Sequence, residues 1–531
     1  MRAGRYGAGP VPSAGLVRSA VRAAIGVAIG VAGVAVGIAV RFAGSGERTG
    51  RVDPLGRGPK STGVVIARTI DALRRRRVSA RSAAAVAYVA SLFMAALDTH
   101  VVNIMLPTLT VELDSALSAV QWTVLAYVLA LAIAMPASGW LATRFGDRSV
   151  FQASLGAFTV ASGLCGLAQN LPELIGLRVV QGASGGLVMT VATSMLYRIY
   201  PPEERARLVR TLLLPIAVGP AIAPPLGGFL VEHLSWRWAF LINVPVGLVT
   251  MALIALGLPR VPPNRPGRFE LRGYLLAGVG LAAVLLTLTQ GPEWGWASPA
   301  VLVLAVLGPA ALAVSVVVQL RSSAPLLDLR LLGGRLFRQT NIATAFQTAT
   351  FLGGILFITP IFLQDRAGSS PLQAGLVMAL VPVGVVVSSQ TVGRRYHVIG
   401  PRLMSVVGLG LLGAICLCLA LFGGSTPMWA FCALMFLAGL TNGGAMVALQ
   451  ASMFAQVGPE LMGSASTILN VNRQVATAVG VATATILMTS PLSGGFRVAY
   501  LATALFALLG AVAATRIRDS EAAETMRSPA G

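Results

Sequence analysis

The sequence predicts an all-α integral membrane protein with about fourteen spanning helices. Three observations support this class: composition, the spacing of apolar runs and the placement of arginine. Of 531 residues, 55% are hydrophobic and only 11% are charged, whereas soluble domains carry about 25% charged residues. A soluble chain of this length would need several domains with polar surfaces. Too few charged residues are present to cover such surfaces.

Apolar runs long enough to cross a bilayer recur along the chain, since a spanning helix needs about 20 apolar residues. The loops between them are too short for a soluble catalytic domain, and the sequence has no GxxxxGK[ST] phosphate-binding loop. We therefore expect no enzyme activity and no cofactor. The predicted spans are 82–106, 120–141, 150–168, 173–196, 211–231, 239–258, 273–290, 299–320, 340–363, 372–392, 403–423, 428–450, 464–489 and 498–515.

Arginine is concentrated in every second loop. The loops after even-numbered spans are Arg-rich, except for 451–463, and the loops after odd-numbered spans hold at most one Arg each. Because positively charged loops stay on the cytoplasmic side, we predict a plasma-membrane protein with both ends of its fourteen-helix body in the cytoplasm. The net charge of +21 has this origin; no basic stripe with interleaved aromatic residues indicates nucleic-acid binding.

The first 81 residues, rich in Gly, Ala and Arg, precede this body as an N-terminal extension. Within it, 23–40 is an uncharged apolar run. The run is compatible with a fifteenth span, with a signal-like or surface segment, or with an extension outside the core. We favour the extension outside the core.

A repeated turn divides the body into two similar parts. GWLATRFGDR (139–148) and GRRYHVIGPR (393–402) each carry two glycines seven residues apart and an Arg two residues after the second. Each turn follows the second span of a six-span block, which predicts two homologous six-helix bundles, as is common in transporters. The predicted divisions are the extension (1–81), an N-terminal bundle (82–258), an intervening helix pair with its loops (259–338), a C-terminal bundle (339–516) and a cytoplasmic tail (517–531).

Several short motifs, in order along the chain, resemble those of the major facilitator superfamily, and in particular the fourteen-helix drug:proton antiporters of the EmrB/QacA group. The resemblance covers about 82–516 and implies two six-helix bundles with two intervening helices. The motifs are LDTHVVNIMLP (97–107), WTVLAYVLALAIAMPASGWLATRFGDR (122–148), RVVQGASGG (178–186), GPAIAPPLGG (219–228), SWRWAFLINVPVG (235–247), PLQAG (371–375) and NVNRQ (470–474).

Three residues depart from the family's motifs. His100 stands where the family has Thr, Thr143 where it has Asp, and Ala223 where it has Gly. The change at Thr143 removes a charge that in the family helps to latch the cytoplasmic side. Asp147 is the candidate to replace that charge.

Asp98 is the first candidate for proton coupling. A carboxylate inside a span costs about 2.5–3.5 kcal/mol on insertion scales, and such residues usually mark proton or cation pathways; a hydrated Asp near the surface is the structural alternative. His100 lies about 200° further round the helix and is either a second protonatable group or a hydrogen-bonded residue between helices. The resemblance implies that Arg178 takes part in proton transfer, and Gln181 shares its helix face.

Other polar residues inside spans, or in the case of Gln364 directly after one, are expected to line the substrate cavity or to link helices: Asn103, Gln181, Gln364, Asn470, Arg473 and Gln474. Glycines and prolines of the motifs are expected to permit tight turns, close helix approach and a kinked gating helix. With one arginine, this gating set is Gly139, Gly146, Arg148, Gly219, Pro220, Pro224, Gly227 and Gly228.

Together these features predict a proton-driven exporter that works by alternating access. Its substrate is expected to be a small, largely apolar or cationic molecule, such as a drug. The expected partners are this substrate, protons and the lipid bilayer, and the chain is expected to act as a monomer. Two alternatives stay open: an exporter of an endogenous metabolite or lipid, and a non-transporting membrane sensor with a transporter fold.

Overall fold

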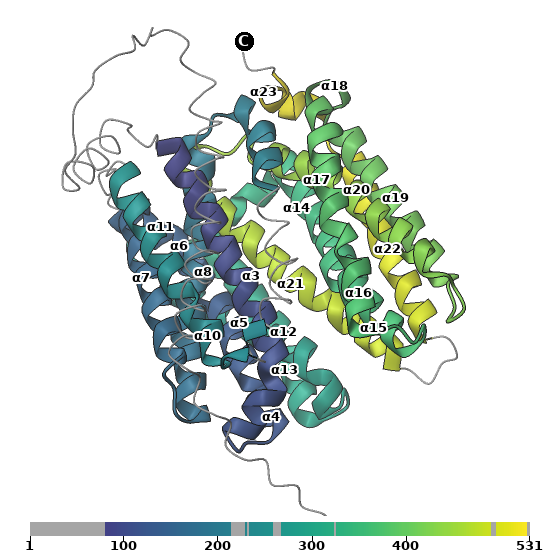
Figure 1. Ribbon diagram of the computed structural model, residues 1–531. Coiled ribbons are helices and arrows are strands. Elements are labelled where there is room, and N and C mark those ends of the chain that lie inside the picture. The colour runs from purple at the N-terminus through teal and green to yellow at the C-terminus, as the bar shows by residue number, and fades with distance from the viewer. Residues whose placement is uncertain are drawn as a thin grey trace, which may run out of the picture.

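The computed structural model describes residues 80–213, 229–230, 233–258, 267–322, 325–489 and 495–527, and all regular structure in these ranges is helical (Figure 1). The apolar run at 23–40 and the motif at 219–228 lie outside them. The α-helices are α3 (Ala80–Glu112), α4 (Leu117–Val120), α5 (Trp122–Ala134), α6 (Ser138–Phe145), α7 (Asp147–Cys165), α8 (Leu171–Ile199), α10 (Arg237–Leu241), α11 (Asn243–Gly257), α12 (Leu271–Trp294), α13 (Pro299–Arg321), α14 (Arg335–Thr348), α15 (Leu356–Asp365), α16 (Pro371–Met378), α17 (Leu380–Thr391), α18 (Tyr396–Ile399), α19 (Pro401–Ala420), α20 (Met428–Met453), α21 (Met462–Thr489), α22 (Gly495–Thr515) and α23 (Ala523–Met526).

Ten helical segments in the described ranges are long and apolar enough to cross a membrane. The longest, Arg335–Asp365, joins α14 and α15 through a π-helical stretch, η4 (Ala349–Ile355). Three other long helices, α3, α7 and α21, accompany these ten and carry polar or charged residues. The chain is therefore an all-helical, multi-pass membrane protein. The total of fourteen spans and the role of the N-terminal run stay predictions.

The repeated turn adopts the same backbone conformation in both copies. Gly146, between α6 and α7, has a φ of 84°, and Gly400, between α18 and α19, has a φ of 81°. Glycine tolerates this left-handed region because it has no Cβ. Both turns lie at the end of the molecule marked by α18 and α23 in Figure 1. We name it the Arg-rich end, because it holds Arg144, Arg198 and Arg394.

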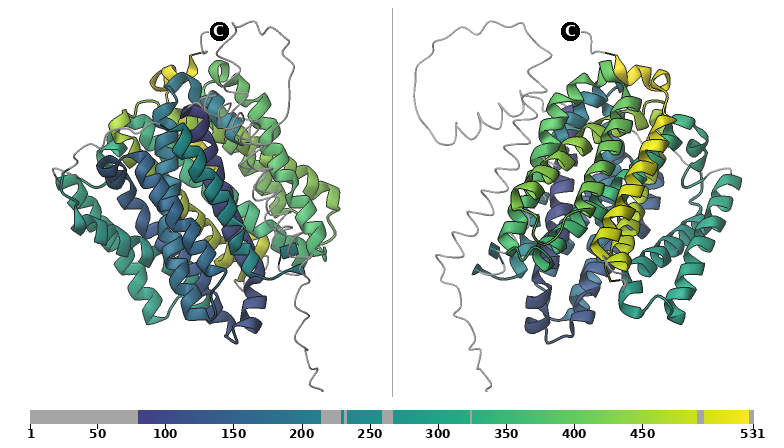
Figure 2. Two further views of the ribbon diagram at one scale, coloured as in Figure 1. Left: turned by 60° about the vertical axis from the view of Figure 1, so that its left-hand side comes forward. Right: turned by 90° about the vertical axis from the view of Figure 1, so that its right-hand side faces the viewer.

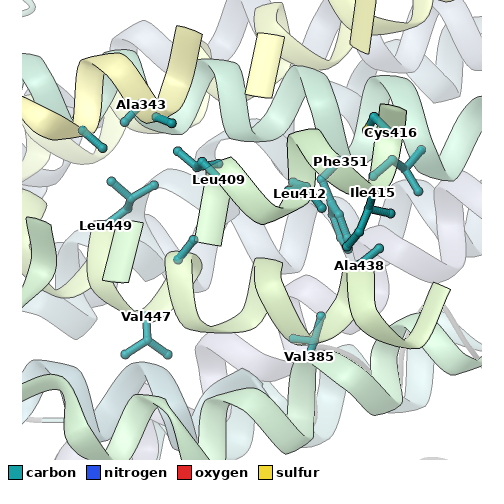
Figure 3. Packing of buried hydrophobic residues seen from close by; sticks show 14 of the residues in the cluster. Ala343, Phe351, Val385, Leu409, Leu412, Ile415, Cys416, Ala438, Val447 and Leu449 are labelled. Carbon is teal, nitrogen blue, oxygen red and sulfur yellow. The ribbon is translucent and has the colours of Figure 1, made fainter. Parts of the chain in front are cut away.

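The helices form two groups, with α21 running between them (Figure 1). The N-terminal group, which contains α3, α5, α7, α8 and α11, surrounds buried side chains such as Phe151 and Leu155. The C-terminal group, which contains α14, α17, α19, α20 and α22, surrounds a larger cluster that includes Leu409 and Leu412 (Figure 3). Each group thus has its own apolar interior.

The α12–α13 pair stands at the edge of the molecule (Figure 2). Leu281 and Leu285 of α12 pack with Ala132 of α5 and with Val471 and Val475 of α21. α13 packs against the outer side of α12 and has few buried residues. The pair therefore covers a seam between α5 and α21 on one side of the protein.

Candidate functional site

A charged cluster lies inside the N-terminal group, between α3 and α8. Arg178 Nη1 donates hydrogen bonds to Asp98 Oδ2 at 2.5 Å and to Gln181 Oε1 at 2.9 Å. Gln181 Nε2 in turn donates to Asp98 Oδ1 at 2.9 Å. None of the three residues is more than 1% exposed. Three residues that the sequence marked as candidates thus form one closed hydrogen-bonded ring.

Helix α5 supplies two further contacts to Arg178. Arg178 Nε donates to the backbone oxygen of Thr123 at 2.8 Å, and Arg178 Cζ lies 4.1 Å from the centre of the Tyr127 ring. The second contact has the geometry of a cation–π interaction. Sequence reasoning missed both partners, although Thr123 and Tyr127 are one helical turn apart and therefore share a face.

Two glycines of the RVVQGASGG motif hold α8 against α5. A Cβ added at Gly182 would lie 2.2 Å from the backbone oxygen of Tyr127, and one added at Gly186 would lie 2.3 Å from that of Leu131. Only helices with glycine at these positions can approach so closely. This approach brings the Tyr127 ring over the Arg178 guanidinium.

The C-terminal group has an uncharged counterpart of this arrangement. Gln347 Nε2 in α14 donates to Asn442 Oδ1 in α20 at 2.9 Å, and both side chains are buried. Helix α20 approaches α17 through Gly439 and Gly443, where an added Cβ would lie 2.0 Å and 2.6 Å from backbone oxygens of α17. Both groups therefore contain a glycine-packed helix pair, but the buried ion pair is found only in the N-terminal one among the described residues.

Helix α21 places Arg473 toward the N-terminal group. The half-buried Arg473 interacts with Tyr88 of α3 and lies near Tyr197 of α8. Asn470 is buried and donates to its own helix backbone at 2.9 Å, and Gln474 is half-buried. Of these three predicted network residues, Arg473 is the one that reaches across to the other group.

Of the remaining predicted cavity residues, Gln364 is not brought together with this cluster. Gln364 is exposed near the end of α15, where it donates to the backbone oxygen of Pro360 at 3.2 Å. The side chains of His100 and Asn103, like the gating segment that holds Gly219, Pro220, Pro224, Gly227 and Gly228, lie outside the described part of the chain. Sequence reasoning missed Asn472, which donates to the backbone of Asn341 in α14 at 2.9 Å.

The two groups of helices meet closely at the Arg-rich end. A Cβ added at Gly139 in α6 would lie 3.3 Å from the backbone carbon of Gly463 in α21. Beside this contact, the hydroxyls of Ser138 and Thr467 are 2.9 Å apart and buried. Gly139 therefore serves a close approach between the groups, in addition to its place in the repeated turn.

Asp147 is joined to the C-terminal group through an arginine. Arg198 Nη1 donates to Asp147 Oδ2 at 2.6 Å, and Arg198 Nε donates to the backbone oxygen of Pro459 at 2.9 Å. Burial raises the pKa of the Asp147 carboxyl, and the Arg198 charge partly offsets this rise. Thr143 donates only within its own helix, to Gly139 at 2.9 Å. Asp147 thus takes part in a contact between the groups that Thr143 does not make.

Two other arginines at this end have distinct partners. Arg148 Nη2 donates to the backbone oxygen of Ala255 at 2.8 Å, so it caps the end of α11 within its own group. Arg205 is buried and its Nη1 donates to the backbone oxygen of Phe454 at 2.6 Å, across the boundary between the groups. The sequence marked Arg205 only as a loop charge, because nothing in its local pattern identifies a partner so distant in the chain.

Two groups of membrane-spanning helices with an internal polar cluster and a close contact at one end are an arrangement common among secondary transporters. The family model described as Major Facilitator Superfamily matches residues 88–481 and 342–530. The chain is 33% identical over 402 residues to "Multidrug resistance protein B homolog" of Mycobacterium tuberculosis, covering 75% of this chain and 74% of that one. It is 33% identical over 398 residues to "Putative multidrug resistance protein MdtD" of Serratia proteamaculans, covering 75% of this chain and 83% of that one.

Two solved structures share the fold. The human organic anion transporter MFSD10 (TETRAN) superposes with a TM-score of 0.61 at 15% identity, over 83% of this chain and 99% of that one. The proton:xylose symporter XylE bound to 6-bromo-6-deoxy-D-glucose superposes with a TM-score of 0.58 at 15% identity, over 82% and 95%. The chain belongs to the major facilitator superfamily. It is therefore a membrane transporter of small molecules and not an enzyme, as the sequence predicts.

Proposed function

We propose that this chain is a proton-coupled exporter of drugs or similar small, largely apolar molecules. Its relatives in Mycobacterium tuberculosis and Serratia proteamaculans carry names of multidrug resistance proteins, which supports export of such compounds. The motif resemblance to drug:proton antiporters supports coupling to protons. We place the protein in the plasma membrane, as a monomer.

The observation that carries the proposal is the Asp98–Arg178–Gln181 ring. Desolvating two buried ions costs several kcal/mol each, and their mutual attraction often does no more than offset this cost. We therefore attribute the buried Asp98–Arg178 pair to function rather than to stability. When Asp98 takes up a proton, Arg178 loses its counter-ion but keeps its contacts with Thr123 and Gln181. These contacts hold Arg178 in place whether or not Asp98 carries a charge.

Alternating access connects this ring to the contacts at the Arg-rich end. We place this end in the cytoplasm, because positively charged loops stay there. Loading from the cytoplasm then requires Gly139 to part from Gly463 and Arg198 to part from Pro459. In the form that is closed at this end, Asp98 takes up a proton from the outer side and the substrate leaves there. After this end opens, Asp98 releases that proton to the cytoplasm, so that protons move inward as the substrate moves outward.

The proposal is tested with the full chain in proteoliposomes that carry a pH-sensitive dye in the lumen. A pH gradient is imposed, and candidate drugs of either charge are added to one side. We expect substrate-dependent proton flux in the wild type and its loss in Asp98→Asn. The matched control, Asp365→Asn, removes a carboxylate that is exposed at the end of α15 and should behave as wild type.

Equal flux in wild type and Asp98→Asn with every transported compound would contradict the coupling role of Asp98. Uptake that ignores the pH gradient would contradict proton coupling altogether. The absence of substrate-dependent flux with any compound would favour the alternative of a membrane sensor.

A further inference from the structure

The predicted spans contain few ionised side chains. The sequence places Asp98, Arg178 and Arg473 well inside spans, with Glu173 at the edge of the fourth and the titratable His100 in the first. Asp98 and Arg178 form an ion pair with each other. Arg473 forms no ion pair with any residue that the structure describes. Among the described residues, Arg473 is therefore the one arginine inside a predicted span that has no carboxylate partner.

Arg473 lies where α21 becomes accessible. From 462 to 470 most residues of α21 are buried, because this part is closed between the two groups at the Arg-rich end. The residues 471–475 are all half-buried. The change occurs beside Arg473, so its side chain is less enclosed than the part of α21 that is closed between the two groups.

Within the part of the chain that the structure describes, the surroundings of Arg473 offer hydrogen bonds but no ion-pair partner. Tyr88 of α3 interacts with both Arg473 and Thr193, and Tyr197 of α8 lies near the same guanidinium. Tyr88 and Tyr197, and Thr193 beside Tyr88, belong to the N-terminal group and carry hydroxyls, which can donate to an anion. Arg473 itself comes from the other side of the interface. A ligand bound here would therefore contact both groups of helices.

We propose that Arg473, with the hydroxyls of Tyr88 and Tyr197, forms a binding subsite for the anionic group of an amphipathic substrate, such as a carboxylate or sulfonate on an apolar body. The inference rests on the proposed transport function and narrows its substrate class. An arginine without a counter-ion in an apolar setting is costly, and a bound anion removes that cost. A cationic substrate would add a second uncompensated charge of the same sign.

Two dyes with the same aromatic skeleton test this proposal. 1-Anilinonaphthalene-8-sulfonate carries a sulfonate, and N-phenyl-1-naphthylamine lacks it. Saturable binding of each to the purified full chain in detergent micelles is measured by equilibrium dialysis, with empty micelles as the blank. We expect the wild type to bind the sulfonate at least about tenfold more tightly, the range of one charge-assisted hydrogen bond.

Substitutions then assign the difference to one side chain. In Arg473→Gln, binding of the sulfonate should weaken about tenfold while binding of the uncharged dye is unchanged, and Arg473→Lys should recover part of the loss. Arg497→Gln, which removes the same charge from an exposed position, is the matched control and should bind both dyes as wild type does. Tyr88→Phe, which keeps the ring, should weaken sulfonate binding selectively and serves if Arg473→Gln does not elute as a folded protein.

The outcomes separate this subsite from the transport mechanism. Equal binding of the two dyes by the wild type, or an equal loss of both in Arg473→Gln, would overturn the anion subsite. Selective loss of the sulfonate in a protein that shows no proton flux would support the subsite while contradicting proton coupling.

Discussion

Arg178 in α8 and Met435 in α20 occupy corresponding positions in the two groups of helices. Each stands four residues before a glycine, Gly182 or Gly439, at which its helix touches the backbone of a neighbouring helix. Both side chains are fully buried. The repeat thus preserves the helix contact in both copies, and charge is present at this position in one copy only.

The correspondence between Arg178 and Met435 predicts what happens when the arginine is replaced by methionine. Removing one partner of a buried ion pair costs about 3–5 kcal/mol, because the other charge is left unpaired. Asp98→Asn and Arg178→Met should therefore each lower the unfolding temperature in detergent. The double variant should recover most of the lost stability, since replacing a whole buried pair is often neutral.

Transport measurements distinguish the functional role of the Asp98–Arg178 pair from its effect on the stability of the protein. All three variants should lose substrate-dependent proton flux, including the double variant that regains stability. The pair does not act as one coupled unit if the stability loss of the double variant equals the sum of the losses in the two single variants. Transport by the double variant would contradict the coupled unit in the same way.

A second prediction concerns the contact that positions Arg178. In Gly182→Ala the new Cβ would lie 2.2 Å from the Tyr127 backbone oxygen, so α8 must move away from α5. Overpacking of this kind costs about 1–3 kcal/mol, and the Tyr127 ring should shift off the guanidinium. Thermal unfolding and proton flux measure the two effects.

A glycine of the same helix provides the control for this change. Gly176 is exposed, and an added Cβ would meet nothing within 4 Å. Gly176→Ala should therefore be neutral or add about 0.5–1 kcal/mol of helix stability. Equal effects of the two alanines would show that the approach of α8 to α5 is not required.

The ionic part of the site is readily predicted from sequence. Asp98 and Arg178 carry opposite charges inside apolar spans, and two such charges need each other in a low-dielectric interior. The turns at Gly146 and Gly400 could also be predicted from sequence. A glycine repeated at a helix break indicates a left-handed backbone conformation, which residues with a Cβ rarely adopt.

The partners across helices were not predictable in the same way. Arg198 and Arg205 looked like ordinary loop charges, yet both donate to backbone oxygens of the other group. Gln364 was expected to line the substrate cavity or to link helices, but it is exposed. Such contacts depend on which helix faces approach each other, and local sequence periodicity does not contain that information.

A third prediction follows from the raised pKa of Asp147, which precedes the predicted span 150–168. A carboxyl with a folded-state pKa above its ordinary value of 3.8 binds its proton more tightly in the folded protein. It therefore stabilises the folded protein when the pH is below the ordinary pKa, and this stabilisation is lost as the pH rises through the raised folded-state pKa. The unfolding temperature of the wild type minus that of Asp147→Asn should therefore decrease as the pH rises between these two pKa values and stay constant at higher pH.

Unfolding scans from about pH 3.5 to about pH 8 check this dependence. Asp365→Asn changes an exposed carboxyl and should run parallel to the wild type throughout. A wild-type curve parallel to that of Asp147→Asn would contradict a perturbed Asp147.

A fourth prediction uses the contact between Gly139 and Gly463. A Cβ at Gly139 would lie 3.3 Å from the Gly463 backbone carbon, and one at Gly463 would lie 3.0 Å from the Gly139 Cα. Disulfides need Cβ atoms about 3.5–4.5 Å apart, so Gly139→Cys with Gly463→Cys should cross-link under mild oxidation. The cross-linked protein should not transport, and reduction should restore flux to the level before oxidation, because the disulfide prevents opening at the Arg-rich end.

The two single-cysteine variants, oxidised in parallel, control for the native cysteines and should keep their flux. Undiminished transport by the cross-linked protein would mean that the two groups need not part at this contact.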